Sequence, residues 1–260
     1  MKRNTLWSWL WIVLGVLYFF IPLYATFDFS LRAKRGVLSF AAYENLFHDP
    51  NFFKSFGFSL EMAVLTIIVS LAIIVPTAYW VHLKLPSFKP VLDFITLVPF
   101  VIPAIVLVYG LIKTYSSEPL SFANSPALLV TAYVVLSFPY MYRAVDTGLR
   151  AMDVRTLTEA AQSLGAGWPT IIIQVIFPNL RAALLSGAFL TFAIVIGEFT
   201  MAAMLNWPAF GPYMVLLGLN RAYEPAALAI ISFGLTWASL GMIQLLGRGV
   251  GGQAQVAGAR

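Results

Sequence analysis

Six long stretches of this sequence contain no Asp, Glu, Lys or Arg, and they restrict the fold more than any other feature. They cover residues 4–27, 62–83, 94–112, 119–142, 182–197 and 225–247. A helix needs ~20 residues to cross the ~30 Å hydrocarbon core of a bilayer. Five stretches meet that length, and 182–197 meets it once Glu198 is included. Because the apolar runs are continuous rather than alternating, the sequence predicts an all-α membrane protein with six transmembrane helices.

The composition supports lipid as the solvent of this chain. It is 60% hydrophobic and 10% charged, against about 45–50% apolar and 25% charged residues in soluble domains. The absence of cysteine excludes a disulfide framework and any thiol-based metal or redox site. The net charge of +5 is typical of basic residues kept at the cytoplasmic face. It therefore does not indicate a nucleic-acid partner.

The apolar segments predict a single transmembrane domain over residues 1–250, followed by a disordered tail at 251–260. The predicted spans are about 6–27, 56–81, 91–115, 126–142, 182–205 and 225–246. The first run is longer than the ~7–15 apolar residues of a signal peptide, so it predicts a retained span. The region between the last two spans predicts an outer loop with a short interfacial helix. With the N-terminus inside, cytoplasmic segments hold ten Lys and Arg and outer segments six, so both termini are predicted to be cytoplasmic.

Residues 143–181 form the longest polar interruption between two spans. Asp153 or Thr156 can cap a helix that ends at Gly165, because glycine readily adopts the left-handed conformation that terminates helices. A second short helix follows, and Pro178 separates it from the fifth span. The sequence thus predicts a helix-turn-helix in the cytoplasm.

This segment carries a signature with fixed spacing. Its positions are Glu159, Ala160, Ala161, Gly165, Val175, Phe177 and Pro178. The pattern resembles the signature of the permease subunits of binding-protein-dependent ATP-binding cassette importers: Glu-Ala-Ala, three residues, Gly, nine residues, Ile, one residue, Leu-Pro. Val175 and Phe177 replace Ile and Leu of that signature and keep an apolar face. The six-span layout and the proline-rich third span extend the resemblance over nearly the whole chain.

The resemblance implies a fold, a role and a set of partners. The fold would be that of a type I importer permease, and the 143–181 segment would be the coupling segment that docks in a cleft of a cytoplasmic ATPase. Glu159 would meet a basic or amide group there, and Gly165 would permit the tight turn. The partners would be a second, homologous permease forming a heterodimer, two ATPase copies, a periplasmic or lipid-anchored binding protein, and membrane lipid. The protein would be located in a bacterial inner membrane.

ATP hydrolysis is expected in a partner subunit and not in this chain. The sequence has no Gly-x-x-x-x-Gly-Lys-Ser/Thr phosphate loop, so ATP and Mg are expected in the ATPase and no cofactor or metal in this chain. The two histidines, His48 and His82, lie in different predicted loops without a ligand set. We expect a transport subunit, with no catalytic residue and no enzymatic activity of its own.

A few residues inside the spans are candidates for the translocation path. Charges within a bilayer are costly and usually face a cavity or a partner, which directs attention to Glu198 and Glu61. Pro99 and Pro103 remove backbone donors from the third span, so that span is expected to bend or unwind. Tyr109 could line the route. For Glu198, a hydrogen bond that stabilises the helix bundle explains the residue equally well.

The substrate is less constrained than the fold. The run Val98–Ala104 and the Gly-Glu-Phe at 197–199 look like the branch that moves spermidine and putrescine, with relatives that handle phosphonates, opines and ferric iron. A polyamine would suit Glu198 and Glu61. The alternatives are a gradient-driven secondary transporter, which often has inverted repeats that this sequence does not show, and a membrane scaffold without transport.

Overall fold

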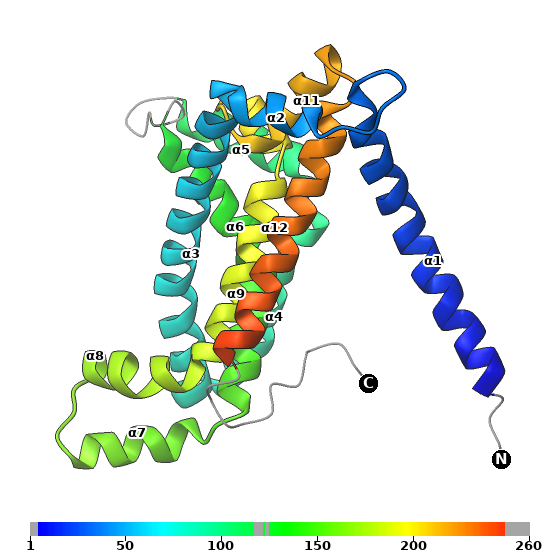
Figure 1. Ribbon diagram of the computed structural model, residues 1–260. Helices are drawn as coiled ribbons and strands as arrows, with labels where there is room; N and C mark the ends of the chain where they lie inside the picture. The colour runs from blue at the N-terminus through cyan, green and yellow to red at the C-terminus, as the bar shows by residue number, and fades with distance from the viewer. Residues whose placement is uncertain (1–4, 117–121, 123–124, 248–260) are drawn as a thin grey trace. The chain divides into compact units, whose positions relative to one another are not determined.

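The computed structural model describes residues 5–116, 122 and 125–247. Apart from one isolated β-bridge, the regular structure of these ranges is helical (Figure 1). The chain divides into two compact units. One comprises Met1–Lys54 and Tyr213–Trp237, and the other comprises Ser55–Pro212 and Ala238–Arg260. The prediction of a single domain over 1–250 stays a prediction, and the predicted tail at 251–260 lies outside the described residues.

Four helices in the described ranges are long and apolar enough to cross a membrane. The candidate spans are Trp7–Ala33, Pro50–Lys84, Pro126–Arg150 and Trp168–Gly197. A bent pair, Pro86–Val101 with Ala104–Tyr115, makes a fifth if it counts as one span. The protein is therefore an all-helical membrane protein with four to five candidate spans, where the sequence predicted six. The sixth predicted span corresponds to α12 (Glu224–Gly247), whose described apolar part, Glu224–Ala238, is shorter than a span.

The predicted bend of the third span is confirmed. Helix α4 (Lys89–Val101) ends after Pro99, α5 (Ala104–Tyr115) begins after Pro103, and the two axes differ by 100°. Proline has no backbone N–H to donate, so the two prolines weaken the same turn. Helix α3 (Pro50–Lys84) contains Pro76 and stays helical through it. It extends beyond the predicted limits 56–81 at both ends.

Helices α6 (Pro126–Arg150) and α9 (Phe177–Gly197) form the most closely packed pair of the second unit. A Cβ on Gly148 would lie 2.7 Å from the Ala183 Cβ, and one on Gly187 would lie 2.7 Å from the Met141 sulfur. Small residues at these positions let the two helices approach closely. Helix α6 runs beyond the predicted end at residue 142, since its last turns bind the cluster of charges described below.

The segment between α6 and α9 folds back on itself. Helix α7 (Val154–Ser163) leads through a turn to α8 (Trp168–Thr170), a π-helical stretch at Ile171–Ile176, and then α9. Figure 1 shows α7 and α8 next to one another at the lower end of α6 and α9. The predicted helix-turn-helix is therefore present. Pro178 does not separate this segment from the fifth span as predicted, because helical turns run without a break from Trp168 to Gly197. The π-helical turn at Ile171–Ile176 lies directly before the proline.

The fifth predicted span, 182–205, is not one continuous helix. Helix α9 ends at Gly197, and the short α10 (Thr200–Met204) begins after a break at Glu198. Helix α11 (Phe210–Asn220) then forms the short helix predicted between the last two spans.

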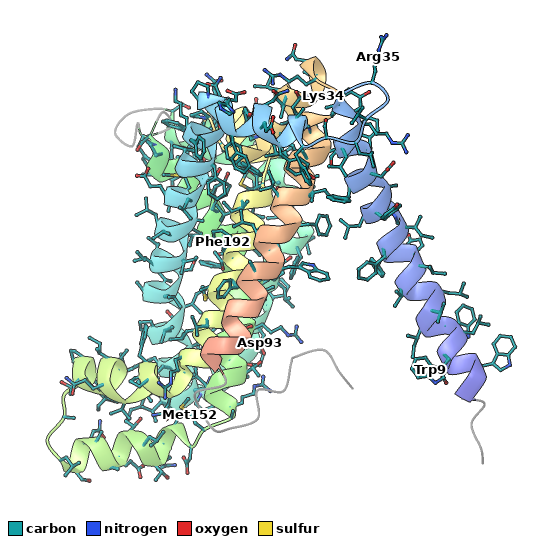
Figure 2. The ribbon with its side chains drawn as sticks, viewed as in Figure 1. Trp9, Lys34, Arg35, Asp93, Met152 and Phe192 are labelled. Carbon is teal, nitrogen blue, oxygen red and sulfur yellow. The ribbon has the colours of Figure 1, made fainter. Side chains whose placement is uncertain are left out.

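The first unit contains α1 (Thr5–Ser30), a 3₁₀ turn at Leu31–Ala33 and α2 (Ala41–His48). The Ser30 hydroxyl bonds the Tyr43 hydroxyl at 2.8 Å, and the Asn45 amide donates to the Glu224 carboxylate at 3.0 Å. Figure 2 shows Lys34 and Arg35 projecting from the turn after α1. In its described part, α1 has no buried residue within its most apolar window.

Candidate functional site

Helix α7 begins at a carboxylate cap. The Asp153 Oδ1 accepts a hydrogen bond from the Thr156 backbone N–H at 3.0 Å, and Oδ2 accepts one from the Thr156 hydroxyl at 2.7 Å. These bonds stabilise the charged carboxylate and lower the pKa of Asp153, the backbone bond being the larger cause. Of the two caps that the sequence allowed, Asp153 is the one that caps, and Thr156 is its donor.

The two faces of α7 differ in exposure. Val154, Thr158 and Ala161 are buried against the rest of the unit, while Glu159 is exposed. The Arg155 Nε donates to the Glu159 Oε1 at 2.8 Å, which raises the pKa of Arg155. An exposed pair of this kind contributes little to stability, so Glu159 can exchange Arg155 for a charge on another protein at small cost.

The turn after α7 has the geometry of a Schellman motif. Gly165 adopts φ +81°, its N–H donates to the Gln162 carbonyl at 2.9 Å, and the Ala166 N–H donates to the Ala161 carbonyl at 3.0 Å. A side chain at this φ would be strained, so glycine is required by conformation. Beside it, Leu164 is 89% exposed. Sequence analysis missed Leu164, because an apolar residue next to a helix end is expected to pack inward.

A second group of charges lies where α3 and α6 end and α4 begins. The Asp146 carboxylate pairs with the Lys89 ammonium, with Arg150 Nε at 2.8 Å, and with His82 Nε2 at 3.4 Å. Three basic partners thus surround one carboxylate, and two of them, His82 on α3 and Lys89 on α4, hold these helices to α6. In Figure 2, Asp93 on α4 and Met152 after α6 both lie toward this end. Sequence analysis did not predict this cluster, because His82 and Lys89 lie far before Asp146 in the chain.

The break at Glu198 is also held by a carboxylate. The Glu198 Oε1 accepts from the Met201 N–H at 2.8 Å, and Oε2 accepts from the Ala202 N–H and the Tyr133 hydroxyl, each at 3.2 Å. A Cβ on Gly211 would lie 2.3 Å from the Glu198 carbonyl oxygen. Glu198 therefore caps α10 and bonds α6, as the bundle-stabilising alternative expected. A role in the translocation path stays a prediction.

The other predicted path residues are only partly brought together. Pro99 is buried in the last turn of α4, Pro103 caps α5, and α5 packs against α10 just after Glu198. Tyr109 on α5 and Glu61 on α3 are exposed. Among the described side chains, no hydrogen bond or ion pair joins either of them to Glu198. The two breaks thus lie together, while Tyr109 and Glu61 stay separate candidates.

The part of the chain that contains this geometry matches one family model. The model describes a binding-protein-dependent transport system inner membrane component and matches residues 86–250. That range is more than half of the chain and includes α7, the Gly165 turn and the Glu198 break. The chain belongs to this family. It is therefore an inner-membrane, multi-pass transport component rather than an enzyme, as the Glu159–Pro178 spacing predicted.

The relatives that this chain resembles carry the names of transport systems for different substrates. The spermidine/putrescine transport system permease protein PotB of Escherichia coli K12 is 26% identical over 174 residues, which cover 61% of this chain and 62% of PotB. The molybdenum transport system permease protein ModB of the same organism is 30% identical over 62% of this chain and 78% of ModB. A probable sulfate transport system permease protein, cysT of Prototheca wickerhamii, is 28% identical over 75% and 79%.

Solved structures with low sequence identity to this chain have a similar fold. A bacterial ABC transporter involved in alginate import superposes with a TM-score of 0.69 at 13% identity and covers 95% of this chain and 96% of that one. The methionine ABC transporter MetNI superposes with a TM-score of 0.60 at 16% identity over 75% and 94%. The fold of this family member is thus that of importer permeases.

Proposed function

We propose that this protein is the permease subunit of an ATP-driven importer and forms half of its translocation path. The observation that carries the proposal is the Glu159–Pro178 segment: the signature residues lie on an exposed helix, a glycine turn and a return helix, held between two membrane helices. The family membership supports it independently. Glu159, Ala160 and Gly165 are exposed, while Ala161 is buried and fixes the helix to the membrane part.

The exposed face of α7 is the proposed docking surface for a cytoplasmic ATPase. Leu164 presents an apolar side chain with almost no cover directly after α7, and Glu159 lies five residues before it on that helix. Burial of the Leu164 side chain would contribute apolar area to an interface, and the charge of Glu159 would help to set its register. Pro178 begins the helix that transmits the contact into the membrane.

The remaining partners and the topology follow from the same proposal. We propose a heterodimer with a second, homologous permease, two ATPase copies that bind ATP and Mg, and a periplasmic or lipid-anchored binding protein that delivers the substrate. No cofactor is assigned to this chain. The type I fold with six spans, counting α12 and the bent α4–α5 pair, and two cytoplasmic termini belong to the proposal. The similarity to the alginate transporter over 95% of the chain supports it.

For the substrate we propose a polyamine or a related small polar solute. The similarity to PotB, a spermidine and putrescine permease protein by name, supports this choice. ModB and cysT are similar to a comparable degree and carry the names of molybdenum and sulfate systems. Uptake of labelled spermidine, molybdate and sulfate into cells that express the complete system separates the cation from the two oxyanions.

Docking is tested by co-purification from the native membrane in mild detergent. The wild-type chain should retain an ATPase and a second permease, and Leu164→Ser should weaken ATPase retention about tenfold, because a buried leucine side chain contributes ~1.5–3 kcal/mol. Glu159→Arg should abolish ATP-driven uptake while the protein stays inserted. The matched control is Leu219→Ser, which changes another largely exposed leucine, on α11. Equal loss in both leucine variants, or a wild-type chain that purifies alone, would contradict the proposal.

A further inference from the structure

Helix α3 contacts the α7–α8 segment although it is not joined to it along the chain. The Tyr79 hydroxyl on α3 lies 2.8 Å from the Thr158 hydroxyl on α7. Both residues are buried, with exposures of 0% and 2%. Thr158 immediately precedes Glu159, the first residue of the signature. One buried polar contact therefore connects a membrane helix to the centre of the proposed docking helix.

The direction of this hydrogen bond can be assigned. The Thr158 hydroxyl donates to the Val154 carbonyl at 2.6 Å, and a hydroxyl has one hydrogen to donate. Tyr79 must therefore donate and Thr158 accept. Separating the two residues would leave the phenolic O–H buried without an acceptor, which is more costly than the net value of an ordinary hydrogen bond. The contact consequently resists separation of α3 from α7.

The same end of α3 also holds α8. The Trp80 and Trp168 rings meet edge to face with their centroids 5.1 Å apart, and the Lys84 ammonium lies 6.0 Å from the centre of the Trp168 ring. Contacts of both kinds are attractive at these distances. Consecutive residues of α3 thus bind both helices of the segment.

Toward its N-terminal end, α3 is hydrogen-bonded to the elements around the Glu198 break. The Ser59 hydroxyl accepts from the Phe210 N–H at 2.8 Å, and the next residue, Gly211, packs directly on the Glu198 carbonyl. Between them, Ser70 bonds Ser137 of α6 at 2.9 Å. Because a helix rises 1.5 Å per residue, Ser59 and Tyr79 are about 30 Å apart along α3. One continuous helix joins α7 to this break.

We propose that Tyr79 is a positioning residue that makes α3 move with α7, so that displacement of the docking helix reaches the Glu198 break through α3. This inference rests on the proposed function, since it requires an ATPase that moves α7. Helices α6 and α9 also reach this break, through the Tyr133–Glu198 bond and the end of α9 at Gly197. The Tyr79–Thr158 bond adds a third helix and a direct connection to Phe210 and Gly211.

The experiment uses the complete complex in lipid nanodiscs and the fact that the chain has no cysteine. Spin labels are placed at Ile68→Cys on α3 and Gln162→Cys on α7, both exposed, and their distance is measured without nucleotide and after trapping with ATP, Mg and vanadate. In the otherwise wild-type chain we expect one narrow distance in both states. Tyr79→Phe and Thr158→Val should match it without nucleotide, and after trapping their separated population should rise about five- to tenfold.

Two variants serve as controls. Thr158→Ser keeps the accepting hydroxyl and should behave as the wild type, and Tyr24→Phe removes an exposed phenol from α1 and should change nothing. The inference is overturned if Tyr79→Phe keeps one narrow distance after trapping, or if the two labels already separate in the wild type. If no ATPase binds the wild-type chain, the proposed function fails instead, and the two failures are distinguishable.

Discussion

Helices α7 and α10 begin in the same way but in opposite surroundings. Each starts at an acidic side chain that accepts backbone N–H groups, Asp153 in one case and Glu198 in the other. Asp153 lies in an exposed polar segment, whereas Glu198 lies half-buried at the break between the apolar helices α9 and α10. Water can replace the Asp153 cap, but little water is available to replace the Glu198 cap. A carboxylate that accepts backbone N–H groups is therefore expected to contribute little to stability at Asp153 and much more at Glu198.

The largest effect is expected from removing the membrane cap. Glu198→Ala leaves the Met201 and Ala202 N–H groups and the Tyr133 hydroxyl without their acceptor, which should lower stability by roughly 2–4 kcal/mol. Thermal unfolding of the purified protein in mild detergent measures the loss. Glu61→Ala is the matched control, since Glu61 is an exposed glutamate of the same membrane part. Equal shifts in both variants would show that Glu198 is no more structural than Glu61.

A smaller effect is expected from the two glycines that accompany these turns. Gly211→Ala places a methyl group 2.3 Å from the Glu198 carbonyl oxygen, and relieving such overpacking costs about 1–3 kcal/mol. Gly165→Ala meets open space but must adopt φ +81°, at a cost of about 1–2 kcal/mol. Gly165→Asn should recover part of that loss, because asparagine tolerates this φ, while Gly211→Asn should be worse than Gly211→Ala. If the Ala and Asn variants ranked in the same order of stability at both positions, the two glycines would not be required for different reasons, close packing at Gly211 and positive φ at Gly165.

The smallest effect is the pH dependence of the exposed cap. The pKa of Asp153 is lower in the folded protein than in the unfolded chain, so its cap stabilises α7 above the unfolded value of about 3.9. The contribution is lost as the pH falls through the folded value. Amide hydrogen exchange at Thr156, corrected for the intrinsic rate, should therefore lose protection between pH 5 and about pH 2. Asp153→Asn still accepts the bond without titrating, so a similar acid-induced loss in that variant would exclude this cause.

Local signals predicted most of the α7 region and little of the α10 region. Asp153 and Gly165 act on residues within a few positions of themselves, so sequence neighbours define their roles. The bend at Pro103 was predictable for the same reason, since proline lacks its donor in every context. Glu198 bonds Tyr133 and contacts Gly211, and these partners are distant in sequence. Its charge was evident from the sequence, but its use as a cap depended on how three segments meet.

Contacts between distant helices were beyond prediction for the same reason. Tyr79 and Thr158 are ordinary residues of an apolar helix and a polar one, and neither marks the other as a partner. The cluster around Asp146 combines residues of α3, α4 and α6. Leu164 was missed for the opposite reason, because an apolar residue next to a helix end is expected to pack inward and this one stays exposed.

The close approach of α6 and α9 at Gly148 and Gly187 has a mechanical consequence for the segment between them. Because a Cβ at Gly148 would collide with Ala183, the end of α6 and the beginning of α9 are fixed side by side. The α7–α8 segment thus starts and ends at neighbouring points of one tightly packed helix pair. A displacement of the turn near Leu164 would therefore act on α6 and α9 together rather than on one of them.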